Sequence, residues 1–166
     1  MTNLVICTLL LWGQFTMNID SVNEKIREYG YANFEPLSEK WSVYCLEDKT
    51  IIKLKVVPSK FLKKDDDYAI ESTTIIAAFT PPTLKGQPTL PFPVTDSEKM
   101  KVLDKTDMKF DVVTEPWNEY ALDDGIKVSI KPVAVSISST TLHDIRGEAV
   151  YQVKQQSIVK KQPLTS

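Results

Sequence analysis

Two stretches of the chain, "EKWSVYCLEDKTIIKLK" at residues 39–55 and "EPWNEYALDDGIKVSIK" at residues 115–131, have nearly the same order of residue types. Shifting the chain by 76 residues aligns residues 20–57 with residues 96–133 without a gap. Eleven of these 38 positions are identical, where average composition would give about two. The identical pairs are Asp20/Asp96, Ser21/Ser97, Lys25/Lys101, Phe34/Phe110, Glu39/Glu115, Trp41/Trp117, Tyr44/Tyr120, Leu46/Leu122, Asp48/Asp124, Lys55/Lys131 and Val57/Val133.

The similarity continues toward the end of each stretch, with a larger offset. "YAIESTTII" from Tyr68 resembles "YQVKQQSIV" from Tyr151, so the offset grows from 76 to 83 residues. The additional residues fall in "STTLHDIRGEA", directly before this last segment. The sequence therefore predicts an internal repeat whose second copy carries a longer loop.

Each copy is predicted to begin with a short helix. In the first copy, Ser21 is the expected N-cap, Glu24 completes a capping box and Gly30 ends the helix. One face of this helix is apolar, with Val22, Ile26 and Tyr29. In the second copy the residues expected to face the core are Met100, Val102 and Leu103.

The rest of each copy is predicted to form antiparallel strands. An extended segment is followed by a strand, an acidic turn ("EDK" or "DDG") and a second strand in which apolar residues and lysines alternate. Strand parity places Trp41, Val43 and Cys45 on one face, and Tyr44 and Leu46 on the other. The alternation changes phase at Val56–Val57 and at Pro132–Val133, which predicts a β-bulge there. Beyond it, the residues expected on the apolar face are Val133, Val135 and Ile137.

These elements predict a mainly β (α+β) protein. Two tandem repeats, each a short helix plus an antiparallel β-meander, would pack with a pseudo-twofold as a barrel-like or sandwich-like body, since a unit of this size is marginal alone. Two separate small domains are the alternative. The expected divisions are an apolar N-terminal segment (1–17), repeat 1 (18–79), a proline-rich connector (80–95), repeat 2 (96–161) and a tail (162–166).

The composition limits the environments and partners of the chain. It has 42% hydrophobic and 25% charged residues, as soluble globular proteins do. The net charge is −2, so the chain lacks the excess of basic residues that is typical of duplex-binding domains. With only two cysteines and no disulfide framework, we expect a cytoplasmic location.

Residues 4–12, "LVICTLLLW", are apolar and uncharged. They are too short for a membrane span, which needs about 20 residues. Three interpretations stay open: a segment upstream of a true start at Met17, a signal or anchor, or a buried strand. Only the second would bring the chain to a membrane.

The repeated aromatic residues and nearby lysines are the candidates for a partner or ligand surface. They are Trp41, Tyr44, Lys53, Lys55, Trp117, Tyr120 and Lys131. The competing interpretation is that the aromatic rings fill the core. Glu39 and Glu115 are expected to satisfy a backbone group or to pair with Lys55 and Lys131.

Catalytic and metal-binding groups are sparse in the sequence. Asp48 and Asp124 could form a carboxylate pair across a pseudo-twofold, as in enzymes whose two carboxylates share a proton, but the turns lack the Asp-Thr/Ser-Gly pattern of aspartic peptidases. His143 is the only histidine, so we expect no metal site. We expect no cofactor either.

The expected function is therefore a non-enzymatic binding or assembly module that uses sheet faces or edges for protein or peptide partners. Single-stranded nucleic-acid binding on a sheet face is the first alternative. An enzyme with a symmetric carboxylate pair is the second. The sequence does not predict an oligomeric state.

Overall fold

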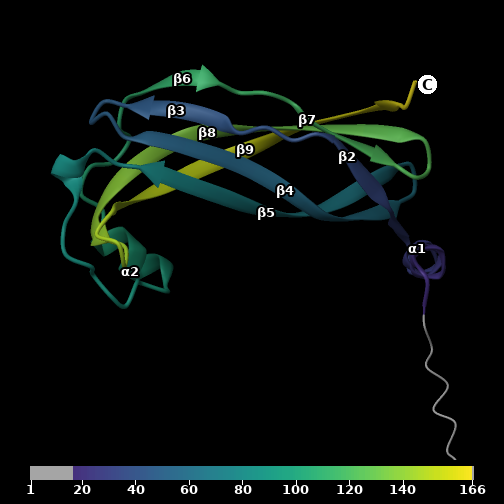
Figure 1. Ribbon diagram of the computed structural model, residues 1–166, viewed down its shortest axis with the longest axis horizontal. Coiled ribbons are helices and arrows are strands. Elements are labelled where there is room, and N and C mark those ends of the chain that lie inside the picture. Colours follow the sequence, from purple (N-terminus) through teal and green to yellow (C-terminus); the bar gives the residue numbers. More distant parts are fainter. Residues whose placement is uncertain (1–16, 166) are drawn as a thin grey trace, which may run out of the picture.

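The computed structural model describes residues 17–165, so the expectations for residues 4–12 lie outside the described part. The chain forms two antiparallel β-sheets packed together, with short helices near the ends of the long axis (Figure 1). The predicted mainly β fold with a sandwich-like body is confirmed. No ladder joins the two sheets within residues 17–165.

We name the two sheets A and B. In sheet A, β4 pairs with β1, β3 and β5, and β3 also pairs with β6. Its strands are β1 (Tyr31–Ala32), β3 (Ser42–Leu46), β4 (Ile51–Lys64), β5 (Asp67–Phe79) and β6 (Phe110–Thr114). Sheet B has the order β2–β7–β8–β9. Its strands are β2 (Phe34–Ser38), β7 (Asn118–Leu122), β8 (Ile126–His143) and β9 (Ala149–Pro163).

Each half of the chain contributes one short strand to the other half's sheet. Strand β2 pairs with β7, where Phe34 lies opposite Leu122. Strand β6 pairs with β3, where Phe110 lies opposite Leu46. Adding 76 to Phe34 and subtracting 76 from Leu122 turns the first pair into the second. The halves are therefore interlocked, while the duplication itself stays a prediction of the sequence comparison.

The long strands bend at matching places, although not at the predicted ones. The β4–β5 register shifts between Pro58 and Lys60, and the β8–β9 register shifts between Ala134 and Ser136. The prediction of a bulge in each copy was correct, but the predicted position was wrong. Each bulge lies further along the chain than Val56–Val57 or Pro132–Val133. Pro58 and Ala134 occupy buried positions, whereas Val135 is 54% exposed and does not face the core.

Two hydrophobic clusters make up the core, and each contains side chains of both halves. The first cluster combines Ala32, Val56 and Phe61 with Tyr120, Leu122, Val128 and Ile130. The second combines Tyr44, Leu46, Ile52 and Leu54 with Met108, Ala134 and Ile137. Neither half can bury its own hairpin without the other.

The first helix begins at a cap that differs from the prediction. The N-cap of α1 (Ile19–Glu28) is Asn18, whose side chain accepts a hydrogen bond from Ser21 N at 2.8 Å, so Ser21 is not the cap. Gly30 ends this helix with a φ of +90°, a conformation that favours glycine.

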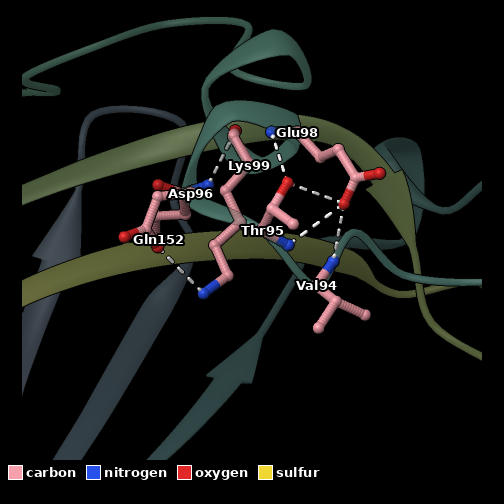
Figure 2. Close-up of polar contacts among 6 residues, drawn as sticks. All are labelled: Val94, Thr95, Asp96, Glu98, Lys99 and Gln152. Carbon is pink, nitrogen blue, oxygen red and sulfur yellow. Dashed lines mark hydrogen bonds and ion pairs between the residues drawn. The ribbon is translucent and has the colours of Figure 1, made fainter.

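Helix α2 (Asp96–Lys101) starts at Thr95, which forms a capping box with Glu98 (Figure 2). The side chain of Gln152 donates a hydrogen bond to Lys99 O at 3.0 Å and joins this helix to β9. Met100 is 66% exposed, so the prediction that it faces the core was wrong.

The proline-rich connector lies against the long loop of the second half. It contains the 3₁₀ turn η1 (Pro82–Leu84). Gly86 N donates to Gly147 O at 2.9 Å, and Thr89 N donates to His143 O at 3.0 Å. A Cβ atom on residue 86 would lie only 2.6 Å from the His143 ring, so a glycine is needed for the connector to lie this close to His143. The additional residues of the second half thus hold the connector in place.

Candidate binding surfaces

The two repeated tyrosines lie in the interior. Tyr44 and Tyr120 are both 0% exposed, so the prediction that they belong to a ligand surface was wrong. Tyr44 Oη donates to Glu115 Oε1 at 2.9 Å, and Tyr120 Oη donates to Glu39 Oε1 at 3.0 Å. Burial raises the pKa of Tyr44 to about 12 and also raises the pKa of Tyr120.

The repeated glutamates connect these tyrosines to sheet lysines. Lys55 Nζ lies 2.7 Å from Glu39 Oε2, and Lys131 Nζ lies 3.9 Å from Glu115 Oε2. The hydrogen bond from Lys55 lowers the pKa of Glu39 below its ordinary value. Each glutamate therefore accepts from a tyrosine of the other half and pairs with a lysine of its own half, which is a structural arrangement rather than a catalytic one.

The two tryptophans lie on different sheets and do not form one aromatic platform. Each precedes its strand by one residue and is half-buried. The Trp41 ring faces Lys55 Nζ on sheet A, 6.0 Å from the ring centroid. The Trp117 ring faces Lys160 Nζ on sheet B at 4.3 Å. Lys160 was not among the predicted residues.

The two turn aspartates are not brought together. The β3–β4 and β7–β8 turns lie at opposite ends of the molecule (Figure 1). Asp48 Oδ2 accepts from Tyr151 Oη at 2.7 Å, and Asp124 accepts from Tyr68 Oη. Each aspartate thus contacts a tyrosine of the other half and is too remote from its counterpart to share a proton with it.

A hollow of about 480 Å³ is lined by Asp48 together with His143, Glu47 and Asp104. Within residues 17–165, no group of three or more histidine, cysteine or carboxylate side chains is arranged to hold a metal ion. The hollow beside Asp124 has a volume of about 390 Å³ and is lined by the acidic turn Asp65–Asp67.

The outer faces of the two sheets differ strongly in chemistry. Buried residues such as Ile52 and Leu54 alternate with outward residues along β4, and strand partners share a face. On sheet A, three outward residues are exposed and apolar: Ile51 (41%), Ile75 (43%) and Phe79 (53%).

The matching outward positions of sheet B are mainly polar or cationic. With offsets of 76 for β8 and 83 for β9, Ile51 becomes Lys127, Glu71 becomes Lys154, Ala77 becomes Lys160 and Phe79 becomes Gln162, while the outward Lys53 and Lys60 become Ser129 and Ser136. The aligned sequences already contain these differences. The sequence alone did not show that these positions face outward, because that depends on the strand register.

The long outer strands leave two backbone edges free. Strand β5 pairs only with β4, and strand β9 pairs only with β8, among the strands of residues 17–165. The two strands contact each other at two places: Gln155 Nε2 donates to Thr74 Oγ1 at 3.2 Å, and Lys161 pairs with Asp67. An unpaired strand edge offers backbone donors and acceptors to another extended chain.

No family model, no curated protein and no solved structure matches this chain. None of the helices in the described part is long and apolar enough to cross a membrane. The faces and edges of the two sheets are therefore the features from which a function can be inferred.

Proposed function

We propose that the chain is a binding module that holds an extended segment of a partner protein against the β5 edge and the outer face of sheet A. The observation that supports this proposal is the character of β5. Over Asp67–Phe79 it contains neither lysine nor proline, and the residues from Glu71 to Ile76 are all exposed.

Proteins usually protect a long edge strand with lysine, proline or a covering loop, because a free edge promotes aggregation. The matching strand β9 carries Lys154, Lys160, Lys161 and Pro163, which disfavour the addition of an apolar strand. The contrast within one molecule favours a role for the β5 edge that requires it to stay accessible.

The side chains beside this edge specify what the partner segment needs. Ile75 and Phe79 point outward on β5, and Ile51 lies opposite Phe79 on β4. A partner strand added to β5 would place its alternate side chains beside these residues. Valine, isoleucine and aromatic residues on that face would bury the most apolar surface.

Sheet A offers less to a nucleic acid. Two of its outward lysines are paired with carboxylates, since Lys55 pairs with Glu39 and Lys60 pairs with Glu71. With Tyr44 in the core, Trp41 and Phe79 lie on this face, and each has a lysine ammonium, of Lys55 and Lys53, over its ring. Stacking of successive bases requires several such rings.

Selection of displayed random peptides of about twelve residues, long enough to pair along β5, tests the proposal. We expect peptides with alternating apolar residues, bound by the full chain. The substitution Ile75→Lys should weaken their binding about tenfold, since it places a charge among the outward apolar side chains.

The matched control is Ile158→Lys at the corresponding position of β9, where Ile158 is 48% exposed. This control should leave the affinity within about twofold of the unsubstituted chain. Equal binding by both variants, or equal loss in both, would remove β5 as the binding edge.

A further inference from the structure

The outer face of sheet B carries lysines along its free strand. Lys154 and Lys160 point outward from β9, because they lie opposite Ser136 and Ser129, while Val153 lies opposite the buried Ile137. They are six residues apart, which corresponds to roughly 20 Å along a strand. The β9 backbone beside them pairs only with β8 within the described part of the chain.

These two lysines differ from the other cations of the face. Lys127 Nζ lies 3.0 Å from Glu119 Oε1, and Lys131 pairs with Glu115. Lys154 and Lys160 have no carboxylate oxygen within 4.0 Å among residues 17–165. Their charges are therefore available to an anionic partner.

The position of Lys160 is defined by an aromatic ring. Its ammonium lies 4.3 Å from the centroid of the Trp117 ring. This cation–π contact restricts the side chain and reduces the entropy that it would lose on pairing with a carboxylate. The residue of sheet A that corresponds to Lys160 is Ala77, and the Trp41 ring is faced instead by Lys55, which is paired with Glu39.

We propose that the β9 edge binds an extended acidic polypeptide segment, which adds as a strand and places carboxylates beside Lys154 and Lys160. The segment carries acidic side chains six positions apart, because directly opposed side chains on neighbouring strands lie about 5 Å from each other. Ile158 lies between the lysines and favours a β-branched residue at the facing position.

Two observations favour a polypeptide over a single-stranded nucleic acid. The face has a free backbone edge, which an extended peptide can pair with and a nucleic acid cannot. Its one tryptophan, Trp117, has the Lys160 ammonium 4.3 Å from the ring centroid, and a single ring offers little to the stacking of successive bases.

The probe for the test is an acetylated peptide that runs from opposite Lys154 to opposite Lys160. It has glutamate at both ends, valine facing Ile158 and threonine elsewhere, with a fluorescent label. We expect it to bind the full chain, and we expect the same peptide with glutamine in place of glutamate to bind about tenfold more weakly. Raising NaCl from about 50 mM to about 500 mM should weaken the glutamate peptide selectively.

The variant Lys154→Glu/Lys160→Glu should lose binding about tenfold or more, because attraction becomes repulsion at both positions. The matched control is Lys53→Glu on sheet A, a strand lysine that also lies over an aromatic ring. This control should bind the probe as the unsubstituted chain does. Circular dichroism of all variants establishes that they are folded.

Strand addition is tested by methylating alternate backbone nitrogens of the probe in its two possible phases. Only one set of amides faces β9, so one phase should abolish binding and the other should retain it. Retention by both phases, or equal affinity of the glutamine peptide, overturns the proposal. Tighter binding of a single-stranded oligothymidine that also depends on Lys154 and Lys160 overturns it in favour of a nucleic acid.

The site lies on sheet B and uses a different strand from the β5 edge of the proposed function, although the two strands touch at Gln155 and Thr74. Failure of one proposal therefore leaves the other intact, and the Ile75→Lys variant should bind the acidic probe normally. Absence of any probe binding would leave the β9 lysines with only the protective role that lysines have on edge strands.

Discussion

Tyr44 and Tyr120 are the residues on which the interior of the molecule depends most. The sequence predicted which face of the strand each tyrosine occupies, because successive side chains of a strand point to opposite faces. Their partners were not, since the sequence holds several carboxylates and gives no distance between the halves. Each tyrosine crosses to a glutamate of the other half, and this arrangement excludes them from a surface role.

The two tyrosines differ in one hydrogen bond, and this difference allows a matched prediction. Tyr44 Oη also accepts a hydrogen bond from Ala134 N at 3.0 Å. The residue that corresponds to Ala134 is Pro58, which has no backbone N–H. Tyr44→Phe would therefore leave a buried donor without its partner, whereas Tyr120→Phe would not.

Tyr44→Phe should lower the free energy of unfolding by about 1–2 kcal/mol more than Tyr120→Phe. Urea denaturation of the two variants, compared with the unsubstituted chain, measures the difference. Equal losses would mean that the Ala134 N–H is satisfied by another group, and the assigned role of Tyr44 would be wrong.

The raised tyrosine pKa values predict a loss of stability at alkaline pH. Burial raises the pKa of Tyr44 and Tyr151 to about 12, from an ordinary value of 10.0. Between pH 10 and about pH 12 the unfolded chain loses protons that the folded chain retains. The stabilisation is complete below pH 10 and declines through this window, because the unfolded state is favoured by ionisation.

Urea denaturation at a series of alkaline pH values, with tyrosinate absorbance followed in parallel, measures this effect. The absorbance of the buried tyrosines should rise only as the chain unfolds. Full ionisation near pH 10 without unfolding would contradict the burial of these phenols.

At the scale of the elements, the strands and turns were largely predictable. The acidic turns between β3 and β4 and between β7 and β8 lie where the sequence indicates. The bulges do not, because Pro58 and Ala134 are buried on the inner face although neither is a typical core residue. Two adjacent valines, Val56 and Val57, suggested an earlier phase change.

The two turns also provide a matched test of backbone strain. Lys49 has a φ of +72°, and Gly125 occupies the corresponding position with a φ of +84°. A Cβ atom on Gly125 would meet nothing within 4 Å, so only the backbone conformation distinguishes the residues there. Left-handed backbone costs a residue other than glycine about 1–2 kcal/mol.

Lys49→Gly should therefore raise the free energy of unfolding, by about 0.5–1 kcal/mol after the larger entropy of glycine in the unfolded chain is counted. Gly125→Lys should lower it by a similar amount. Thermal denaturation of both variants is sufficient to measure the signs, and the same sign in both would contradict the assigned turn conformation.

At the scale of the whole molecule, the exchange of β2 and β6 is the feature that sequence could not supply. A short strand can pair with the hairpin of its own half or with that of the other half, and both choices satisfy the same apolar pattern. The site was predicted only in part. Trp41, Trp117 and the lysines lie on outer faces. The aligned sequences contain the replacement of Ile51 and Phe79 by Lys127 and Gln162, and the strand register shows that these positions face outward.

The central claim is that the halves are interlocked, so that each core cluster requires both. The most direct measurement is unfolding of two fragments, residues 1–80 and 81–166, which are divided before the connector because Gly86 and Thr89 bond to the second half. We predict that neither fragment alone shows a cooperative transition and that an equimolar mixture regains one. A cooperative transition in either fragment alone would contradict the claim.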